Sequence, residues 1–314
     1  MLRSFVFPFV AALVAVGAVQ AAPYPGQPVQ LIVSFPPGGA TDLEARALAQ
    51  AMSQDLGQPL VVHNRGGAGG ALGTAAIAQA NPGGDTVGLI SVAALTILPH
   101  LQPTPYSLAD FSYICQAYDI PVVVSVAPQS RFRTLDELIQ HARAHPGTLN
   151  YATVGPGSLP NMAALDLMRT AGIQMNHIPY KGEALAVTDL LGGHVDVYFG
   201  TNAIASRSGL HRLAVAAAER TDDTGDTPTL KEAGYDVVWS IIGGVLGPRQ
   251  LAAAHRDRLE HACQRAATSP AYHQALHTLN IRPRYASGPE FQATLQHESD
   301  TNRQLLGSVG LLAP

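Results

Sequence analysis

The feature that most constrains this chain is a repeated unit of a short β-branched run, a glycine-rich break and a helical stretch. Residues 29–35 form such a run; two prolines and two glycines follow, and residues 41–56 carry apolar or small side chains at helical spacing. Residues 150–154 repeat the arrangement before a Gly-Pro-Gly break and a helix over about 160–171. Strands that alternate with helices at this spacing predict βαβ units and an α/β fold with mostly parallel sheets.

The chain has 314 residues, which suits about two domains. Loops of the kind that bind ligands follow a strand twice, near residue 40 and near residue 157, which predicts one sheet in each of two lobes. We expect residues 22–120 and 226–314 in lobe 1 and residues 121–225 in lobe 2. The two crossings of the hinge are expected at residues 118–121 and 221–228, where breaker residues cluster.

The N-terminus has the pattern of a secretory signal peptide. Arg3 precedes an apolar run over residues 5–19, and small residues lead up to Pro23. The alternative is a membrane anchor, but the run is shorter than the roughly 20 residues that a spanning helix needs. We therefore expect residues 1–21 to be removed and the rest to be exported. In an oxidising compartment Cys115 and Cys263 either form a disulfide or remain two small buried residues, and the sequence leaves both open.

Composition and motifs exclude several classes of function. The net charge is −4 and the chain holds two lysines, Lys181 and Lys231, so we expect no nucleic acid partner. The sequence contains no GxSxG, HExxH or Walker motif. We therefore expect no catalytic residues, no cofactor and no metal.

The first candidate binding segment is the first loop, residues 35–42, which leads into a helix. Thr41 and Glu44 have the spacing of a capping box, so Thr41 is the expected N-cap. Glycines let consecutive amides turn toward one point, and the helix start adds positive potential, so the loop can bind an anion. The alternative is a loop that only turns the chain and caps the helix. The candidate residues are Phe35, Pro37, Gly38, Gly39, Ala40, Thr41 and Asp42.

The second loop, residues 153–158, repeats this device, with Thr153, Gly155, Gly157 and Ser158 as candidates. If the two loops face each other across a cleft, both can hold one small anion, and closure excludes water. A third segment adds Lys181 and Gly182. Lys181 is either a ligand contact or a surface charge whose stem lies along the protein.

Taken together, these residues resemble the substrate-binding proteins of the tripartite tricarboxylate transporter system, the TctC-like or Bug receptor family. The resemblance runs over essentially the whole mature chain and is carried by the motifs PPGGATD (36–42), NRGGAGG (64–70), PYKG (179–182) and DLLGGHVD (189–196). It implies a periplasmic, two-lobed Venus-flytrap protein that binds small carboxylates between its lobes and passes them to membrane subunits. It also implies that the first and second loops bind the carboxylate, partly through ordered waters.

Three of the departures from the family pattern bear on the ligand. Gly200, a candidate binding residue together with Thr201, stands where an acidic residue is usual, which disfavours a ligand that carries an ammonium group. Residues 92–95 lack the usual hydroxyl groups, so that wall is expected to be apolar. Glu183 replaces a small residue and would repel a carboxylate unless it points outward or pairs with Lys181.

The leading hypothesis is a monomeric receptor for a small organic anion, a mono- or dicarboxylate with an apolar body, that serves a tripartite tricarboxylate transporter. One alternative is an orphan sensor that binds the same anion and feeds a signalling system. The other is an exported hydrolase of carboxylated substrates, which lacks a nucleophile beside a base.

Overall fold

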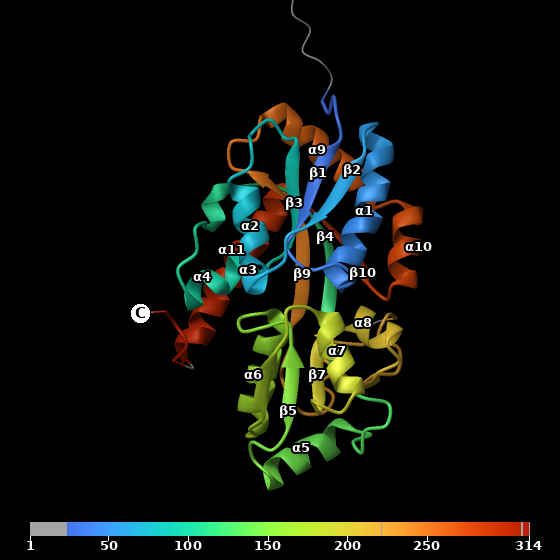
Figure 1. Ribbon diagram of the computed structural model, residues 1–314, viewed down its shortest axis with the longest axis vertical. Coiled ribbons are helices and arrows are strands. Elements are labelled where there is room, and N and C mark those ends of the chain that lie inside the picture. The colour runs from blue at the N-terminus through green and yellow to red at the C-terminus, as the bar shows by residue number, and fades with distance from the viewer. Residues whose placement is uncertain (1–23, 221, 309, 314) are drawn as a thin grey trace, which may run out of the picture.

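The computed structural model describes residues 24–220, 222–308 and 310–313, so the expected signal peptide lies outside the described residues. Two lobes lie one above the other in Figure 1, each built around a β-sheet with helices on its faces. The α/β, two-lobed fold predicted from the sequence is confirmed. Within the described residues, none of the helices is both long and apolar enough to cross a membrane.

Lobe 1 is the upper lobe of Figure 1. Its sheet has the order β2-β1-β3-β9-β4, with β10 on the far side of β4. β1 pairs in parallel with β2 and β3, whereas β9 runs antiparallel to β3 and β4. The strands are β1 (Val29–Val33), β2 (Leu60–Asn64), β3 (Thr86–Ser91), β9 (Ser240–Pro248) and β10 (Arg282–Ser287).

The helices of lobe 1 form two groups. α1 packs on α9 and α10, and α11 packs on α3, so the groups cover opposite sides of the sheet (Figure 1). The helices are α1 (Ala40–Leu56), α2 (Ala71–Ala78), α3 (Ala93–Thr96), α4 (Leu98–Leu101), α9 (Ala253–Ala267), α10 (Pro270–Thr278) and α11 (Gly288–Ser308), with short 3₁₀ turns at Ala68–Gly70 and Leu108–Asp110.

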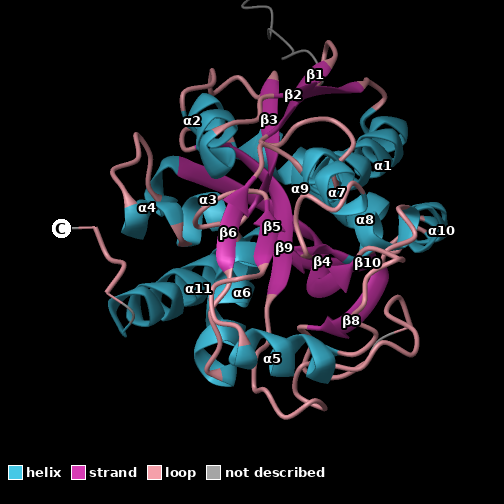
Figure 2. Ribbon diagram, turned by 60° about the horizontal axis from the view of Figure 1, so that its bottom comes forward, coloured by secondary structure: helices cyan, strands magenta, loops and turns pink. Residues whose placement is uncertain are grey.

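Lobe 2 is the lower lobe, which Figure 2 turns toward the viewer. β5 (Asn150–Thr153) pairs in parallel with β6 (Asn176–Pro179) and β7 (Val197–Thr201). The end of β4 runs antiparallel to β7 and to β8 (His211–Val215). The helices of this lobe are α5 (Leu135–Ala144), α6 (Leu159–Ala171), α7 (Glu183–Leu191) and α8 (Asn202–Arg207).

A single long strand, β4 (Phe111–Val126), serves both lobes. The sequence predicted a break in the chain, one crossing of the hinge, at residues 118–121. Instead the strand runs on: Pro121 is its last residue that pairs with β9, and Val122 is the first that pairs with β7. Pro121 looks like a breaker in the sequence, but here it lies where the strand changes partners. Because β4 and β9 run against their neighbours, the sheets are more mixed than predicted.

The return crossing also differs from the expected position. Residues 228–239 remain attached to lobe 2, since the Leu230 amide donates to Val215 O at 2.9 Å and the Trp239 amide donates to Ala216 O at 2.8 Å. The chain re-enters lobe 1 through β9, a strand that the sequence did not predict. The exact division of the chain into lobes stays a prediction.

A disulfide joins the sheet of lobe 1 to a helix. Cys115 on β4 is bonded to Cys263 on α9, with Cα atoms 6.5 Å apart, and both residues are fully buried. Of the two possibilities that the sequence left open, the structure has the disulfide.

Candidate functional site

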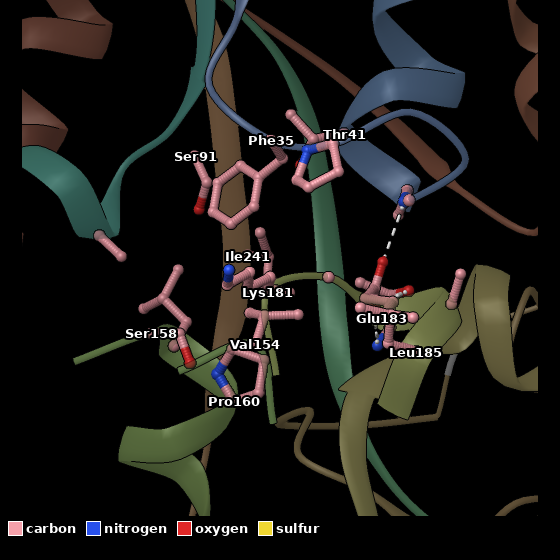
Figure 3. Close-up of a pocket in the computed structure, with 18 of the residues that line it drawn as sticks. Phe35, Thr41, Ser91, Val154, Ser158, Pro160, Lys181, Glu183, Leu185 and Ile241 are labelled. Carbon is pink, nitrogen blue, oxygen red and sulfur yellow. Dashed lines mark hydrogen bonds between the residues drawn. The ribbon is translucent and has the colours of Figure 1, made fainter. Parts of the chain in front are cut away.

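A pocket lies between the lobes, where the first loop, α6, α7 and the end of β7 meet (Figure 3). Its empty volume is about 840 Å³, open solvent included. Most of its wall is apolar. The residues that line it are Phe35, Pro36, Pro37, Gly39, Ala40, Thr41, Ser91, Ala93, Val154, Ser158, Leu159, Pro160, Lys181, Gly182, Glu183, Ala184, Leu185, Thr201 and Ile241.

Five candidates from the first loop line this pocket, namely Phe35, Pro37, Gly39, Ala40 and Thr41, whereas Gly38 and Asp42 do not. Helix α1 begins at Ala40 with Gly39 as its N-cap. The prediction of Thr41 as N-cap is therefore wrong.

The predicted capping box fails because both of its side chains have other partners. Thr41 is the second residue of the helix, and its hydroxyl accepts a hydrogen bond from Tyr118 OH at 3.4 Å. Glu44 is fully buried and accepts a hydrogen bond from Tyr272 OH. The N-cap lies two residues earlier than predicted, and Gly38, just before it, adopts a left-handed φ of 87°.

Asp42 fixes the shape of the first loop from behind. Its carboxylate accepts hydrogen bonds from the Gly38 amide at 2.9 Å, Arg46 Nε at 3.1 Å and Asn64 Nδ2 at 2.8 Å. Burial alone would raise the pKa of Asp42, but the hydrogen bonds from these three groups outweigh burial and lower it. The carboxylate thus stays charged and holds the loop without lining the pocket.

Of the four candidate binding residues in the second loop, one lines the pocket. Ser158 is the N-cap of α6, as the sequence predicted, and lines the pocket. Thr153, Gly155 and Gly157 do not line it. The Gly155 amide donates to Thr153 Oγ1 at 3.1 Å and the Gly157 amide donates to Asn161 Oδ1 at 3.2 Å, so the loop itself uses both donors.

Gly157 is explained by a contact between the lobes. A Cβ atom at this position would lie 2.6 Å from Leu101 Cδ1 and 3.0 Å from Leu98 Cδ2, both on α4 of lobe 1. The backbone also has a left-handed φ of 72° there. The glycine therefore allows α4 to approach the start of α6.

Of the remaining candidate binding residues, some line the pocket and one does not. Lys181, Gly182 and Thr201 line the pocket, and Gly200 does not. Lys181 has no hydrogen-bond or ion-pair partner within the described part of the chain, so its ammonium group is available to a ligand. A Cβ atom on Gly200 would lie 2.0 Å from the Tyr198 ring, so this ring fills the space beside Gly200.

Glu183 neither points outward nor pairs with Lys181, so neither of the two arrangements that would spare a ligand carboxylate from its charge is present. Its side chain is buried, and Oε2 accepts a hydrogen bond from the Ala40 amide at 3.0 Å, across the cleft (Figure 3). Oε1 accepts hydrogen bonds from Tyr198 OH at 2.6 Å, from the Thr201 amide at 3.1 Å and from Thr201 Oγ1 at 2.7 Å. The carboxylate of α7 thus lies at the wall of the pocket.

The chemistry of Tyr198 fits its role as a donor to Glu183. Burial first, and then the charge of Glu183 and the hydrogen bond to it, raise the pKa of Tyr198 well above 10. The phenol therefore keeps its proton at physiological pH and holds the carboxylate in place.

Several lining residues were not found from the sequence. Ile241 belongs to β9, which was not predicted, and Leu185 is an exposed residue of α7. The wall at residues 92–95 contributes Ala93, as expected for an apolar wall, but the neighbouring Ser91 adds a hydroxyl group. The position of Ser91 at the carboxyl end of β3 was a usable signal, because ligand sites of α/β sheets gather at strand ends.

Comparison with known proteins gives the family of the chain. The model of the tripartite tricarboxylate transporter family receptor matches residues 44–311. Protein BugT of Bordetella pertussis is 38% identical over 249 residues, which cover 77% of this chain and 76% of BugT.

Two solved structures have the same fold. The periplasmic binding protein BugD is 28% identical, with a TM-score of 0.86 over 92% of this chain and 99% of BugD. MatC from Rhodopseudomonas palustris with bound malate is 25% identical, with a TM-score of 0.83 over 90% of this chain and 100% of MatC. The family and these structures are solute-binding receptors and not enzymes, as the sequence predicted. This chain belongs to the tripartite tricarboxylate transporter receptor family.

Proposed function

We propose that the protein captures a small organic carboxylate in the pocket between its lobes and delivers it to the membrane subunits of a tripartite tricarboxylate-type transporter. We further propose that residues 1–21 direct its export to the periplasm, where it acts as a monomer. The MatC structure, which holds malate, supports a carboxylate as the ligand class.

The observation that carries the proposal is that three helices begin at the wall of one apolar pocket. The first residues of α1, α6 and α7 are Ala40, Leu159 and Glu183, and all three line it. The first-turn amides of a helix lack partners within the helix, and its dipole adds positive potential, so helix starts favour anions. Lys181 contributes a full positive charge at the same wall.

Binding is tested on protein from which any bound ligand has been removed by urea without reductant, so that the disulfide stays closed, followed by refolding. A ligand at 100 times its Kd should add about 2.7 kcal/mol to the free energy of unfolding. Thermal shift with a panel of mono- and dicarboxylates, followed by calorimetry, should show saturable stabilisation. The proposal fails if no carboxylate stabilises the refolded protein.

Delivery is tested separately, by uptake of the labelled ligand into cells. Uptake should need both this protein and the membrane subunits. Unchanged uptake after loss of this protein, from cells in which the ligand has no other route, would contradict a role in transport.

A further inference from the structure

The start of α1 already holds a carboxylate, and it belongs to the protein. Glu183 Oε2 accepts a hydrogen bond from the amide of Ala40, the first residue of α1, at 3.0 Å. This is the position where the dipole of α1 would stabilise an anionic ligand group. One of the favourable anion positions of the pocket is therefore filled from within the chain.

The Glu183 carboxylate is held rigidly. Its other oxygen accepts three hydrogen bonds from Tyr198 and Thr201, which both lie on β7 of the same lobe, at 2.6 to 3.1 Å. Only 9% of the residue is exposed. A ligand carboxylate would have to displace this group from four donors in order to reach the start of α1.

The charges that line the pocket are separated. Lys181 and Glu183 carry the charges among the lining residues, and in Figure 3 Ser91 lies on the opposite side of the pocket from Glu183. Much of the wall between Ser91 and Glu183 is apolar, with Phe35, Ile241 and Val154 among its side chains. A ligand carboxylate is thus favoured near Lys181 and Ser91 and opposed by like charge near Glu183.

We propose that Glu183 determines specificity by taking the place of one ligand carboxylate, so that the receptor selects monocarboxylates and rejects dicarboxylates of the same length. This inference rests on the proposed function, since it specifies the substrate class of the same pocket. The single carboxylate of the ligand turns away from Glu183, and its uncharged body lies along the apolar wall.

The size of the expected discrimination follows from the repulsion between two like charges. At a separation of about 6 Å and an effective dielectric constant of about 20, the interaction changes a binding constant roughly 100-fold. Because a flexible ligand can move its second carboxylate toward solvent, we expect at least roughly 10-fold in practice.

The first test compares pairs of ligands that differ by one carboxylate. Calorimetry on the refolded protein measures Kd for hexanoate against adipate, pentanoate against glutarate, and butyrate against succinate. The tightest-binding length should favour the monocarboxylate roughly 10-fold or more. A dicarboxylate that binds as tightly as its partner overturns the inference and leaves the proposed function standing, whereas binding by neither class removes both.

The second test changes Glu183 itself. Glu183→Ala should lower the preference for the monocarboxylate roughly 10-fold or more, and Glu183→Gln, which keeps the shape and removes the charge, should lower it too. The matched control is Glu137→Ala, which removes the same charge from the first turn of α5, on the far side of lobe 2 (Figure 1). A preference that is the same in wild type and in every folded Glu183 variant contradicts the inference. If neither variant folds, the wild-type ratio decides.

Discussion

Glu44 gives the sharpest prediction for stability, because it is a fully buried carboxyl group. Tyr272 OH donates to its Oε1, while Oε2 has no hydrogen-bond partner among the described residues. Burial raises the pKa of Glu44 from 4.5 to about 8, and the hydrogen bond from Tyr272 offsets this only in part. At neutral pH the folded protein therefore keeps a proton here that the unfolded chain has lost.

The sign and size of the pH dependence follow from linkage. Between pH 4.5 and 8 the unfolded state binds fewer protons at this site than the folded state, so the free energy of unfolding falls as pH rises. The limiting slope is about 1.4 kcal/mol per pH unit, which gives a loss of about 2.5 kcal/mol between pH 5 and 7. The loss is complete above the folded-state pKa.

Urea unfolding of wild type and Glu44→Gln at pH 5, 6 and 7 measures this contribution. The glutamine stays neutral, so the free energy of unfolding of the variant should lack the pH dependence that Glu44 contributes. The difference in this free energy, variant minus wild type, should therefore rise by about 2.5 kcal/mol from pH 5 to pH 7. Glu290→Gln is the control, because Glu290 is an exposed carboxyl whose pKa hydrogen bonds from Ser287 lower. Parallel curves for Glu44→Gln and wild type would refute the reasoning.

Three further predictions concern the loops and the disulfide. Gly39→Val should abolish ligand-induced thermal stabilisation without unfolding the protein, because a Cβ there already lies 3.3 Å from Glu183 Oε2; unchanged stabilisation would remove the first loop from the site. Asp42→Ala should weaken binding, measured by calorimetry, since it removes the acceptor that holds Gly38, Arg46 and Asn64; unaltered affinity would contradict this role. Reduction of Cys115–Cys263 opens a loop with a sequence separation of 148 and should cost about 2–5 kcal/mol in urea unfolding; an unchanged midpoint would count against it.

Local patterns predicted much of the fold because the signals are local. The strand, glycine break and helix at residues 29–56 and 150–171 all form, since β-branched runs and helical spacing act within a few residues. β9 was missed because Gly243, Gly244 and Gly247 give it little strand propensity. Gly243 is required by a residue far away in the sequence, because a Cβ atom there would lie 2.1 Å from the Tyr118 ring.

The site was harder to predict because its defining contact spans the sequence. The first loop and Lys181 were found from residue types and positions after strands. The hydrogen bond between Ala40 and Glu183 joins residues 143 apart, and nothing near Glu183 in the sequence indicates it. Thr41 and Glu44 were misread for the same reason, since Tyr118 and Tyr272 lie 77 and 228 residues away.

The undivided course of β4 has a mechanical consequence. Its first part is bound into one sheet, and disulfide-linked to α9, while its last five residues are bound into the other. Any opening of the pocket must therefore bend or twist a hydrogen-bonded ribbon at Pro121 and Val122, where no slack loop exists to absorb the motion. We therefore expect the stiffness of this paired strand to resist changes in the angle between the lobes.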